Sequence, residues 1–248
     1  MSRSLILVYG MVSYAIGMGG LGVFVLFVGA GNVLPVHIDS GEPGPLVFAL
    51  SINSGLMILL GLQHTVMARP GFKKRWIQVI PPAAERSTYV LLSGVVFLLI
   101  CFCWQPITGT AWRVDNAVAR TVVTAIQLFG WGLVITSSFV INHLELFGLQ
   151  QVYCYFSDQS EPAPKFTDRF LYKIVRHPLQ LGILIGIWCT ATMTMTHLMM
   201  SVAMTVYIFL GLHFEERDLV ATLGPDYEDY QRRVPMILPI PKRTREVK

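Results

Sequence analysis

The chain has 248 residues, of which 53% are apolar and 14% are charged, and its formal net charge is +4 at neutral pH. An average soluble domain carries roughly 25% charged residues, so this composition excludes a water-soluble protein and gives no indication of a nucleic-acid partner. Several stretches with almost no charge predict transmembrane helices, because about 20 apolar residues span the core of a bilayer. We therefore expect an all-α polytopic membrane helix bundle that forms a single domain over residues 1–248.

Four apolar stretches predict the first four membrane helices. The first, about residues 5–30, is too long for the apolar core of a signal peptide, and we interpret it as a retained helix. The second, residues 46–68, runs directly into the basic residues Arg69, Lys73, Lys74 and Arg75. Basic residues at a helix end mark the cytoplasmic side of a membrane. The third and fourth stretches cover about residues 87–104 and 118–141.

The fifth apolar stretch, residues 179–212, predicts a helical hairpin. As one helix it would be about 50 Å long, whereas the bilayer core is about 30 Å thick. We expect a turn near residues 192–197, where Thr, Met and His interrupt the aliphatic run. This turn keeps the basic residues of the tail on the cytoplasmic side, namely Arg217, Arg232, Arg233, Lys242, Arg243, Arg245 and Lys248. Residues 215–230 are expected to form a cytoplasmic amphipathic helix, interrupted at Gly224-Pro225.

The four cysteines lie in or beside apolar stretches and form no CxxC pair; they are Cys101, Cys103, Cys154 and Cys189. Their spacing predicts neither a disulfide framework nor a metal site, so we expect small buried apolar side chains.

Ionisable residues gather at the predicted helix ends rather than in the middle of the membrane. Such residues are costly at membrane depth and are usually paired or functional. Because the predicted topology places them all at the cytoplasmic surface, they indicate one polar site. Singly, each is also compatible with an interfacial ion pair, an anchor or a helix-end histidine. They are His64, Glu85, Arg86, His143, Glu145, Arg176, His177, His213, Glu215 and Glu216.

The C-terminal part of the chain resembles a known superfamily of enzymes. Arg176-His177-Pro178, Gly182, Glu215-Glu216 and the tyrosines that follow resemble the isoprenylcysteine carboxyl methyltransferases and phospholipid methyltransferases over about residues 170–241. The resemblance implies an integral membrane enzyme that uses S-adenosylmethionine, although Gln180 replaces an aromatic residue of the pattern. The implied cofactor cradle comprises Arg176, His177, Pro178, Leu179, Gly182, His213, Glu215, Glu216, Tyr227 and Tyr230.

The N-terminal part resembles a bacterial branch, the methanethiol S-methyltransferases, which lie within a wider group named for association with nitrite and nitric oxide reductase. The resemblance rests on residues 61–70, 85–89 and 143–149 and, with the cradle, runs over nearly the whole chain. It implies conversion of methanethiol to dimethyl sulfide, with substrate-side helices in about residues 1–150. The bacterial branch suggests a bacterial inner membrane, and the basic residues at the helix ends predict that the site faces the cytoplasm.

The chemistry of the implied reaction suggests roles for these residues. S-adenosylmethionine carries a sulfonium, an ammonium and a carboxylate, so Glu215 and Glu216 are expected to hold the ammonium or ribose hydroxyls. Arg176 or His177 is expected to hold the carboxylate. The expected wall for the adenine consists of Phe214, Tyr227 and Tyr230.

The thiol also needs a proton acceptor, because a small thiol is mostly protonated at neutral pH. His64 and His143 are the candidate bases, and the sequence does not rank them. Glu145 is a candidate orienting group or base, and Arg86 can stabilise the thiolate.

Three other functions fit parts of the pattern. The interfacial histidines suggest a metal or haem site, but each lies on a different segment and no HxxHH or HExxH cluster occurs, so we expect no metal. A methyltransferase for a prenyl-cysteine or a lipid would need a lateral opening for a long tail. A non-enzymatic membrane protein, either a transporter or an accessory factor for denitrification, is the third alternative. The sequence does not predict an oligomeric state.

Overall fold

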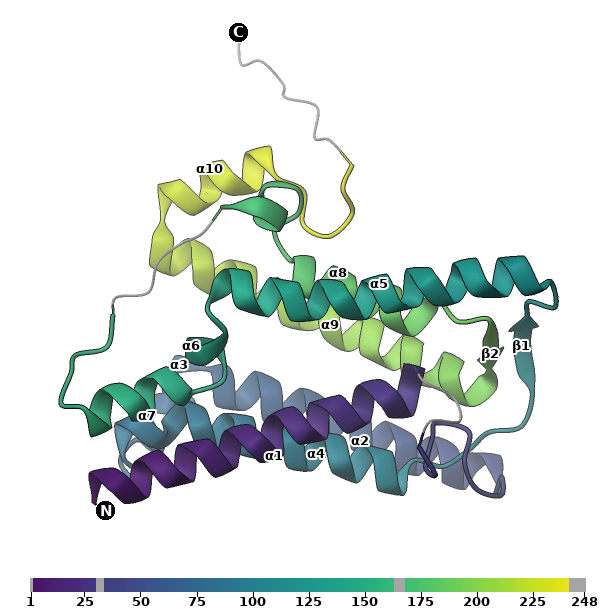
Figure 1. Ribbon diagram of the computed structural model, residues 1–248, viewed down its shortest axis with the longest axis horizontal. Coiled ribbons are helices and arrows are strands. Elements are labelled where there is room, and N and C mark those ends of the chain that lie inside the picture. The colour runs from purple at the N-terminus through teal and green to yellow at the C-terminus, as the bar shows by residue number, and fades with distance from the viewer. Residues whose placement is uncertain (1, 30–33, 163–167, 241–248) are drawn as a thin grey trace, which may run out of the picture. The chain divides into compact units, whose positions relative to one another are not determined.

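The computed structural model describes residues 2–29, 34–162 and 168–240. It is mostly helical, with one two-stranded sheet, which confirms the predicted fold class (Figure 1). Among these residues, five helices are long and apolar enough to cross a membrane, so the protein is an integral membrane protein. They are α1 (Arg3–Gly29), α2 (Leu46–Ala68), α4 (Glu85–Cys103, preceded by η1, Pro82–Ala84), α5 (Ala117–Ile141) and α9 (Met195–Leu223). The basic tail residues Lys242, Arg243, Arg245 and Lys248, used above to predict topology, lie outside the described residues.

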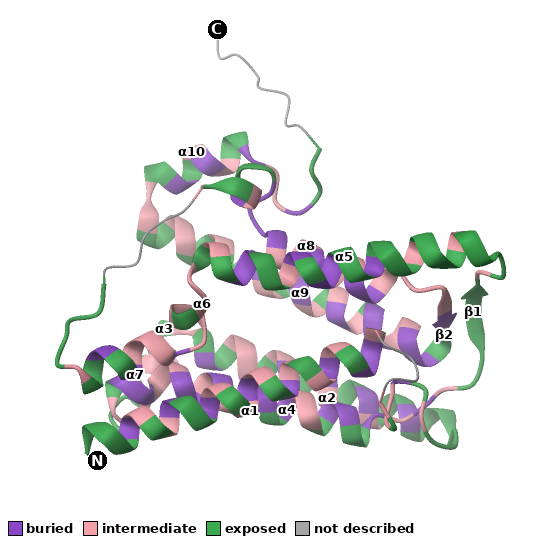
Figure 2. Ribbon diagram, viewed as in Figure 1, coloured by how far each residue is buried: buried purple, intermediate pink, exposed green. Residues whose placement is uncertain are grey.

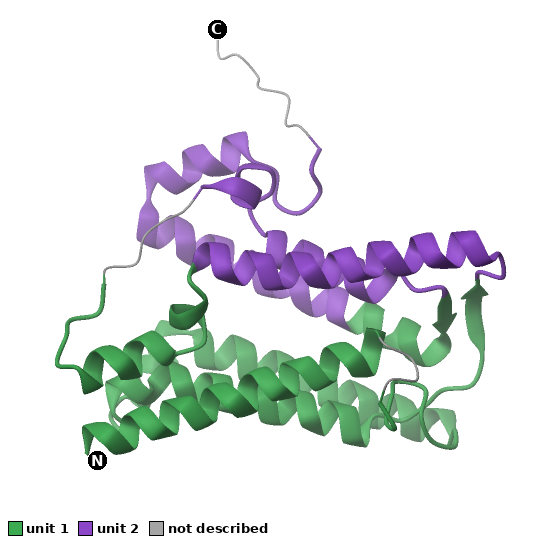
Figure 3. Ribbon diagram, viewed as in Figure 1, with its two compact units in different colours: residues 1–113, 142–163, 192–203 green, residues 114–141, 164–191, 204–248 purple. Residues whose placement is uncertain are grey.

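The chain forms two compact units that interleave along the sequence (Figure 3). Unit 1 comprises residues 1–113, 142–163 and 192–203, and unit 2 comprises residues 114–141, 164–191 and 204–248. Helices α1, α2 and α4 belong to unit 1, and α5 belongs to unit 2. The long helix α9 contributes its first residues to unit 1 and the remainder to unit 2.

Glycines allow α1 and α4 of unit 1 to touch through their backbones. A Cβ atom on Gly20 would lie 2.5 Å from the carbonyl oxygen of Gly94, and a Cβ atom on Gly94 would lie 2.6 Å from the Cα of Gly17. Small residues permit such close approach between helices in lipid. Near the other end of α1, Ile6 is buried together with Val152 of α7 (Leu149–Phe156). Unit 1 also contains the short helices α3 (Pro70–Trp76) and α6 (His143–Leu146).

The sheet of unit 1 was not predicted. Strand β1 (Thr110–Arg113) lies in an expected loop, and β2 (Thr192–Thr194) lies in the expected turn of the hairpin. They pair antiparallel, with Thr110 opposite Thr194. Strands this short, paired with a segment far away in the chain, carry too few residues for an alternating pattern to reveal them.

The structure contains the predicted hairpin, whose first arm and most of whose second arm belong to unit 2. Helix α8 (Pro178–Trp188) ends shortly before β2, and α9 begins at Met195, so the turn lies where the sequence predicted it. The indole of Trp188 donates to the Thr205 hydroxyl at 2.9 Å, and Leu181 packs against the cluster that includes Leu212, so the arms are antiparallel. Helix α8 has only 11 residues, which gives about 16 Å of helix. It is therefore shorter than the expected membrane-spanning arm.

The predicted boundary at the end of the hairpin is wrong. Helix α9 continues past Leu212 to Leu223. The first half of the expected tail helix therefore belongs to the last turns of α9. Gly224 then has a φ of 62°, and α10 (Pro225–Arg233) follows, which confirms the interruption at this point. Helix α10 packs against the end of α9 through Tyr227, Tyr230 and Val234.

Many residues of the membrane helices are exposed (Figure 2), and large apolar side chains are among them. On α5 these include Val118, Phe129 and Phe139. A soluble surface rarely carries so much apolar area, whereas lipid tails cover it without cost. Cys101 and Cys154 are buried as predicted, but Cys103 is exposed at the end of α4, and all four cysteines are free.

Candidate functional site

Glu216 on α9 is the centre of a polar cluster within unit 2. Arg176 donates from Nε to Oε1 and from Nη2 to Oε2 of Glu216, both at 2.8 Å. His177 Nε2 lies 2.6 Å from Oε1, and the Tyr227 hydroxyl donates to the same oxygen at 3.0 Å. The side-chain amide of Gln231 donates to Oε2. Two bonds from the arginine and one from each of three other side chains therefore hold this carboxylate.

Arg176 is also fixed by the backbone of the segment around the end of α10. Its Nη1 donates to the carbonyl oxygens of Val234 at 2.6 Å and Gln231 at 3.2 Å, and its own N–H donates to Pro235 at 2.9 Å. The residue is 8% exposed. A buried arginine–carboxylate pair is stable only where the remaining donors are satisfied, as they are here. The Arg176–Glu216 pair thus ties the start of α8 to α9 and to the end of α10.

Tyr227 and Tyr230 lie behind this cluster, and they are only 3% and 2% exposed. The Tyr230 hydroxyl donates to the carbonyl oxygen of Tyr172 at 2.6 Å. Burial raises the pKa of Tyr230 to about 12, and burial next to Glu216 raises the pKa of Tyr227 as well, so both hydroxyls remain protonated donors at neutral pH. Tyr227 thus supports Glu216, and Tyr230 ties α10 to the segment before α8; the role of these rings as walls for the adenine stays a prediction.

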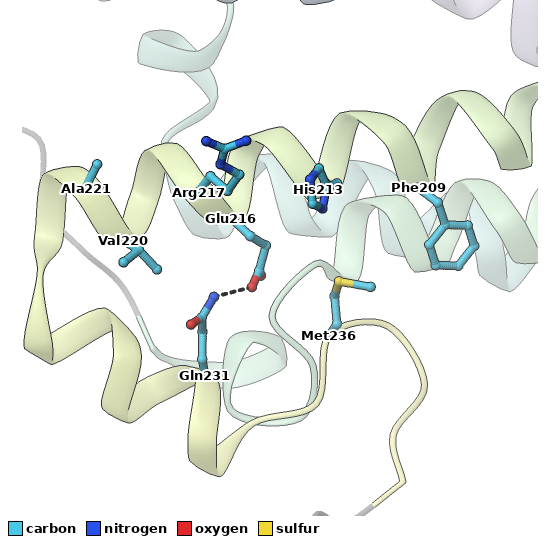
Figure 4. A pocket seen from close by; sticks show the side chains of 8 residues that line it. All are labelled: Phe209, His213, Glu216, Arg217, Val220, Ala221, Gln231 and Met236. Carbon is cyan, nitrogen blue, oxygen red and sulfur yellow. Dashed lines mark hydrogen bonds between the residues drawn. The ribbon is translucent and has the colours of Figure 1, made fainter.

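A pocket of about 660 Å³ lies beside the cluster (Figure 4). Sites for small molecules commonly have volumes of about 300–1,000 Å³. One face of α9 forms its wall, and residues of α10 and of the segment that follows complete it. The lining residues are Phe209, His213, Glu216, Arg217, Val220, Ala221, Gln231 and Met236. The pocket therefore combines an apolar wall with ionisable groups.

The predicted cofactor residues take three kinds of position. His213 and Glu216 line the pocket directly. Arg176, His177 and Tyr227 contact Glu216. A third group of predicted residues does not line the pocket. Pro178 and Tyr230 are buried, Leu179 is half-buried, and Glu215 and Phe214 are exposed.

Gly182 lies in the contact between α8 and α5. A Cβ atom at this position would lie 2.6 Å from the carbonyl oxygen of Gly130 and 2.9 Å from the backbone nitrogen of Val134. One turn further, the side chain of Gln127 donates to the carbonyl oxygen of Gly186 at 3.0 Å. Helix packing alone therefore accounts for a glycine at position 182, and its role in cofactor binding stays a prediction.

The sequence analysis missed several lining residues of the pocket, including Phe209, Gln231 and Met236. The signal was present, because Phe209, His213, Glu216 and Val220 recur at the spacing of one helix face. It was overlooked because the helix was expected to end at residue 212, so these residues were not placed on one continuous element.

In unit 1, the predicted catalytic residue His143 lies at the start of α6. Its Nε2 is 2.9 Å from the Tyr14 hydroxyl on α1, and its ring packs against Phe147 with 4.7 Å between centroids. Burial lowers the pKa of His143, which favours the neutral imidazole that a general base requires. Glu145 accepts a hydrogen bond from the side chain of Asn142 at 3.0 Å.

The other two predicted catalytic residues, Arg86 and His64, meet at Tyr89 of α4. Arg86 donates to the carbonyl oxygen of Leu146 in α6 at 2.8 Å, and its guanidinium lies 5.0 Å from the centroid of the Tyr89 ring. His64 meets the same ring edge-on at 5.5 Å, and its Nδ1 is 3.2 Å from the carbonyl oxygen of Leu60. Through α6 and Tyr89, the structure gathers all four predicted catalytic residues in one region of unit 1.

Comparison with known proteins indicates a family for the chain. Residues 120–224 match the phospholipid methyltransferase family. The chain is 42% identical to the methanethiol S-methyltransferase of Mycobacterium tuberculosis, over 98% of this chain and 99% of that protein. It is 43% identical to methanethiol S-methyltransferase 2 of Bradyrhizobium diazoefficiens, over 96% of this chain and 91% of that protein.

More distant similarity extends to Nurim of Xenopus laevis, which is 24% identical over 84% of this chain and 80% of that protein. No solved structure matches the chain. The 42% identity to the mycobacterial protein extends over nearly the full length of both chains, and it is sufficient to show the family of this chain. The chain belongs to the methanethiol S-methyltransferase family.

Proposed function

We propose that this protein transfers a methyl group from S-adenosylmethionine to methanethiol and so forms dimethyl sulfide. Its relatives carry the name of this reaction. The structural observation that carries the proposal is the pocket of about 660 Å³ beside the Arg176–Glu216 pair, formed by α9 and α10. All of α9 lies within residues 120–224, the segment that matches the phospholipid methyltransferase family.

The lining of this pocket suits the methyl donor. S-adenosylmethionine presents an adenine, a ribose, an ammonium, a carboxylate and a sulfonium, and when bound it supplies an activated methyl group. Phe209, Val220 and Met236 provide an apolar surface for the adenine. Glu216 brings an anionic side chain to the wall that faces the cationic groups of the donor.

We assign Arg176, His177 and Tyr227 to holding Glu216 rather than to direct contact with the donor. Each already contacts the Glu216 carboxylate. A carboxylate held in this way keeps its position without reorganising when a ligand binds, and fixed groups of this kind are what a binding site for a charged molecule needs. Glu215 remains a candidate contact for the ammonium or the ribose, because it is exposed on α9 next to Glu216.

For the thiol, we propose that His143 or His64 accepts the proton. His143 is a suitable base because burial lowers its pKa and keeps the imidazole neutral. Arg86 brings a positive charge that can stabilise the thiolate, and Glu145 lies in the same short helix as His143. Removal of the proton matters because the thiolate, not the thiol, is the nucleophile.

We further propose a bacterial inner membrane with the site facing the cytoplasm. The basic residues of and around α3, from Arg69 to Arg75, directly follow the end of α2. Clusters of this kind are retained on the cytoplasmic side of membranes. The two methanethiol S-methyltransferases compared above come from bacteria.

A headspace assay tests the reaction directly. Purified protein in detergent receives S-adenosylmethionine with an isotopically labelled methyl group, together with methanethiol. We expect labelled dimethyl sulfide from the wild type and little from Arg176→Lys, which retains the charge but loses the bidentate geometry. A protein that binds the donor without forming a volatile product would refute the acceptor. Labelled prenyl-cysteine or phospholipid would then identify the acceptor class.

A further inference from the structure

Arg217 lies on the wall of the pocket but takes no part in the Glu216 cluster. In Figure 4, the side chains of Glu216 and Gln231 point toward each other, whereas the side chain of Arg217 extends away from them. Arg217 is exposed, and it forms no hydrogen bond or ion pair with any residue that the structure describes. Its guanidinium is therefore available to a ligand.

Three other arginines near the pocket, on or beside α8 and α10, are bonded to carboxylates. Arg176 is bonded to Glu216 through Nε and Nη2, both at 2.8 Å. Arg232 and Arg233 both pair with Asp229, at 3.1 and 2.8 Å. The charge of Glu216, the single carboxylate of the pocket lining, is offset by Arg176. Arg217 therefore gives the wall an excess of positive charge, which favours an anionic group on the ligand.

We propose that Arg217 binds the carboxylate of the amino-acid portion of the methyl donor. This inference rests on the proposed function, in which the donor is S-adenosylmethionine. The carboxylate is the only anionic group of that molecule, and the planar guanidinium matches a carboxylate with two parallel hydrogen bonds. Because Arg217 is one of the exposed residues of the lining, its long side chain can reach a ligand without disturbing the buried pair.

The carboxylate keeps its charge throughout methyl transfer, which determines the kinetic effect of Arg217. An interaction that is equal in the bound donor and in the transition state lowers KM without raising kcat. Loss of Arg217 should therefore raise the KM for the donor much more than it lowers kcat. Loss of Arg217 should weaken the binding of the donor before and after it has given up its methyl group by the same factor, because both forms retain the carboxylate.

Equilibrium binding to the purified full-length protein tests this assignment with two probes. S-adenosylmethionine carries the carboxylate, whereas 5′-methylthioadenosine has the adenosine and a thioether but no amino-acid portion. In Arg217→Gln we expect the Kd for S-adenosylmethionine to rise about tenfold or more, with the Kd for 5′-methylthioadenosine unchanged. The Kd of Arg217→Lys for S-adenosylmethionine should lie between that of Arg217→Gln and that of the wild type. Arg232→Gln, at an exposed arginine of α10 outside the pocket lining, is the matched control and should bind both probes normally.

The outcomes separate the failure of this inference from the failure of the proposed function. If Arg217→Gln loses affinity for both probes equally, or for neither, the carboxylate contact is overturned while the donor site stays in place. A wild-type protein that binds neither probe overturns the proposed function and this inference together. Selective loss of S-adenosylmethionine in a protein that makes no dimethyl sulfide supports the contact and refutes only the acceptor.

Discussion

The Glu216 cluster of unit 2 and the histidine region of unit 1 hold their polar side chains in opposite ways. Glu216 is bonded to a charged guanidinium and to three further side chains. His143 and His64 instead contact neutral groups, a tyrosine hydroxyl and a main-chain carbonyl, and each packs against an aromatic ring. Fixed opposite charges make a rigid scaffold, whereas contacts with neutral groups do not hold an imidazole in its charged form. The difference suggests binding in the first region and proton transfer in the second.

The largest effect should come from removal of the central carboxylate. Glu216→Ala leaves the guanidinium of Arg176 buried without its partner, which typically costs about 3–5 kcal/mol. We expect a strongly lowered midpoint of thermal unfolding in detergent. Glu216→Gln, which retains the shape, should show a smaller decrease.

Asp229→Ala is the matched control, because it breaks two ion pairs on the exposed face of α10. Exposed pairs contribute little to stability, so this variant should unfold near the wild-type temperature. Equal midpoints for the Glu216 and Asp229 variants would mean that the buried cluster is not a scaffold, and the contrast between the two regions would fail.

The next largest effect should appear in turnover rather than in stability. General-base catalysis contributes typically about 10²–10⁴-fold, so His143→Gln or His64→Gln should lower kcat by such a factor, with a nearly unchanged thermal midpoint. His37→Gln, in the loop that precedes α2, is the control. Full turnover in both variants would show that neither histidine is the base.

The pH dependence of turnover tests His143 as the base. Burial lowers the pKa of His143, so its neutral form persists to lower pH than that of an ordinary histidine, whose pKa is about 6.5. If His143 is the base, kcat/KM should stay level as the pH falls to about 6.5 and decline only below it. An acid limb centred at or above this value would exclude His143 and favour another group.

A smaller effect is expected from the helix contact in unit 2. Gly182→Ala pushes a methyl group against the backbone of α5, and overpacking of this kind costs about 1–3 kcal/mol. Gly132→Ala, on the same helix pair, meets nothing within 4 Å and should be tolerated. Normal donor affinity in the folded fraction of Gly182→Ala would establish a packing role. Lost donor affinity with unchanged stability would instead indicate that Gly182 has a role in cofactor binding.

The smallest effect concerns Tyr230. Tyr230→Phe removes one buried hydrogen bond, to Tyr172, which is worth about 1 kcal/mol. Because burial raises the pKa of Tyr230 to about 12, while an unfolded tyrosine ionises near 10, its contribution is complete below pH 10 and is lost as the pH rises toward 12. The wild type should therefore lose more stability than Tyr230→Phe over this range in alkaline unfolding curves. Parallel curves would contradict the buried, protonated state.

The membrane helices could be predicted from the sequence because apolar stretches of helical length are local signals. The second stretch was predicted at the observed bounds, Leu46–Ala68. The end of α9 was missed, because its polar last turns no longer resemble a membrane segment although the helix continues. The strands were missed because their pairing joins segments that are distant in the sequence.

The site was predicted as a set of residues but not as a geometry. The structure brings Arg176, His177 and Glu216 into one hydrogen-bonded cluster, as expected for ionisable residues that need partners at membrane depth. Their role in cofactor binding stays a prediction. Individual roles did not follow, because two neighbouring carboxylates look alike in sequence. In the structure Glu216 is engaged by four side chains, whereas Glu215 is exposed.

The division between binding and proton transfer is tested most directly by donor affinity in a protein that lacks both candidate bases. In a His64→Gln/His143→Gln double variant, equilibrium binding of labelled S-adenosylmethionine should match the wild type, while formation of dimethyl sulfide should fall at least a hundredfold. A double variant that loses donor affinity in step with turnover would contradict the account, because the histidine region would then belong to the donor site.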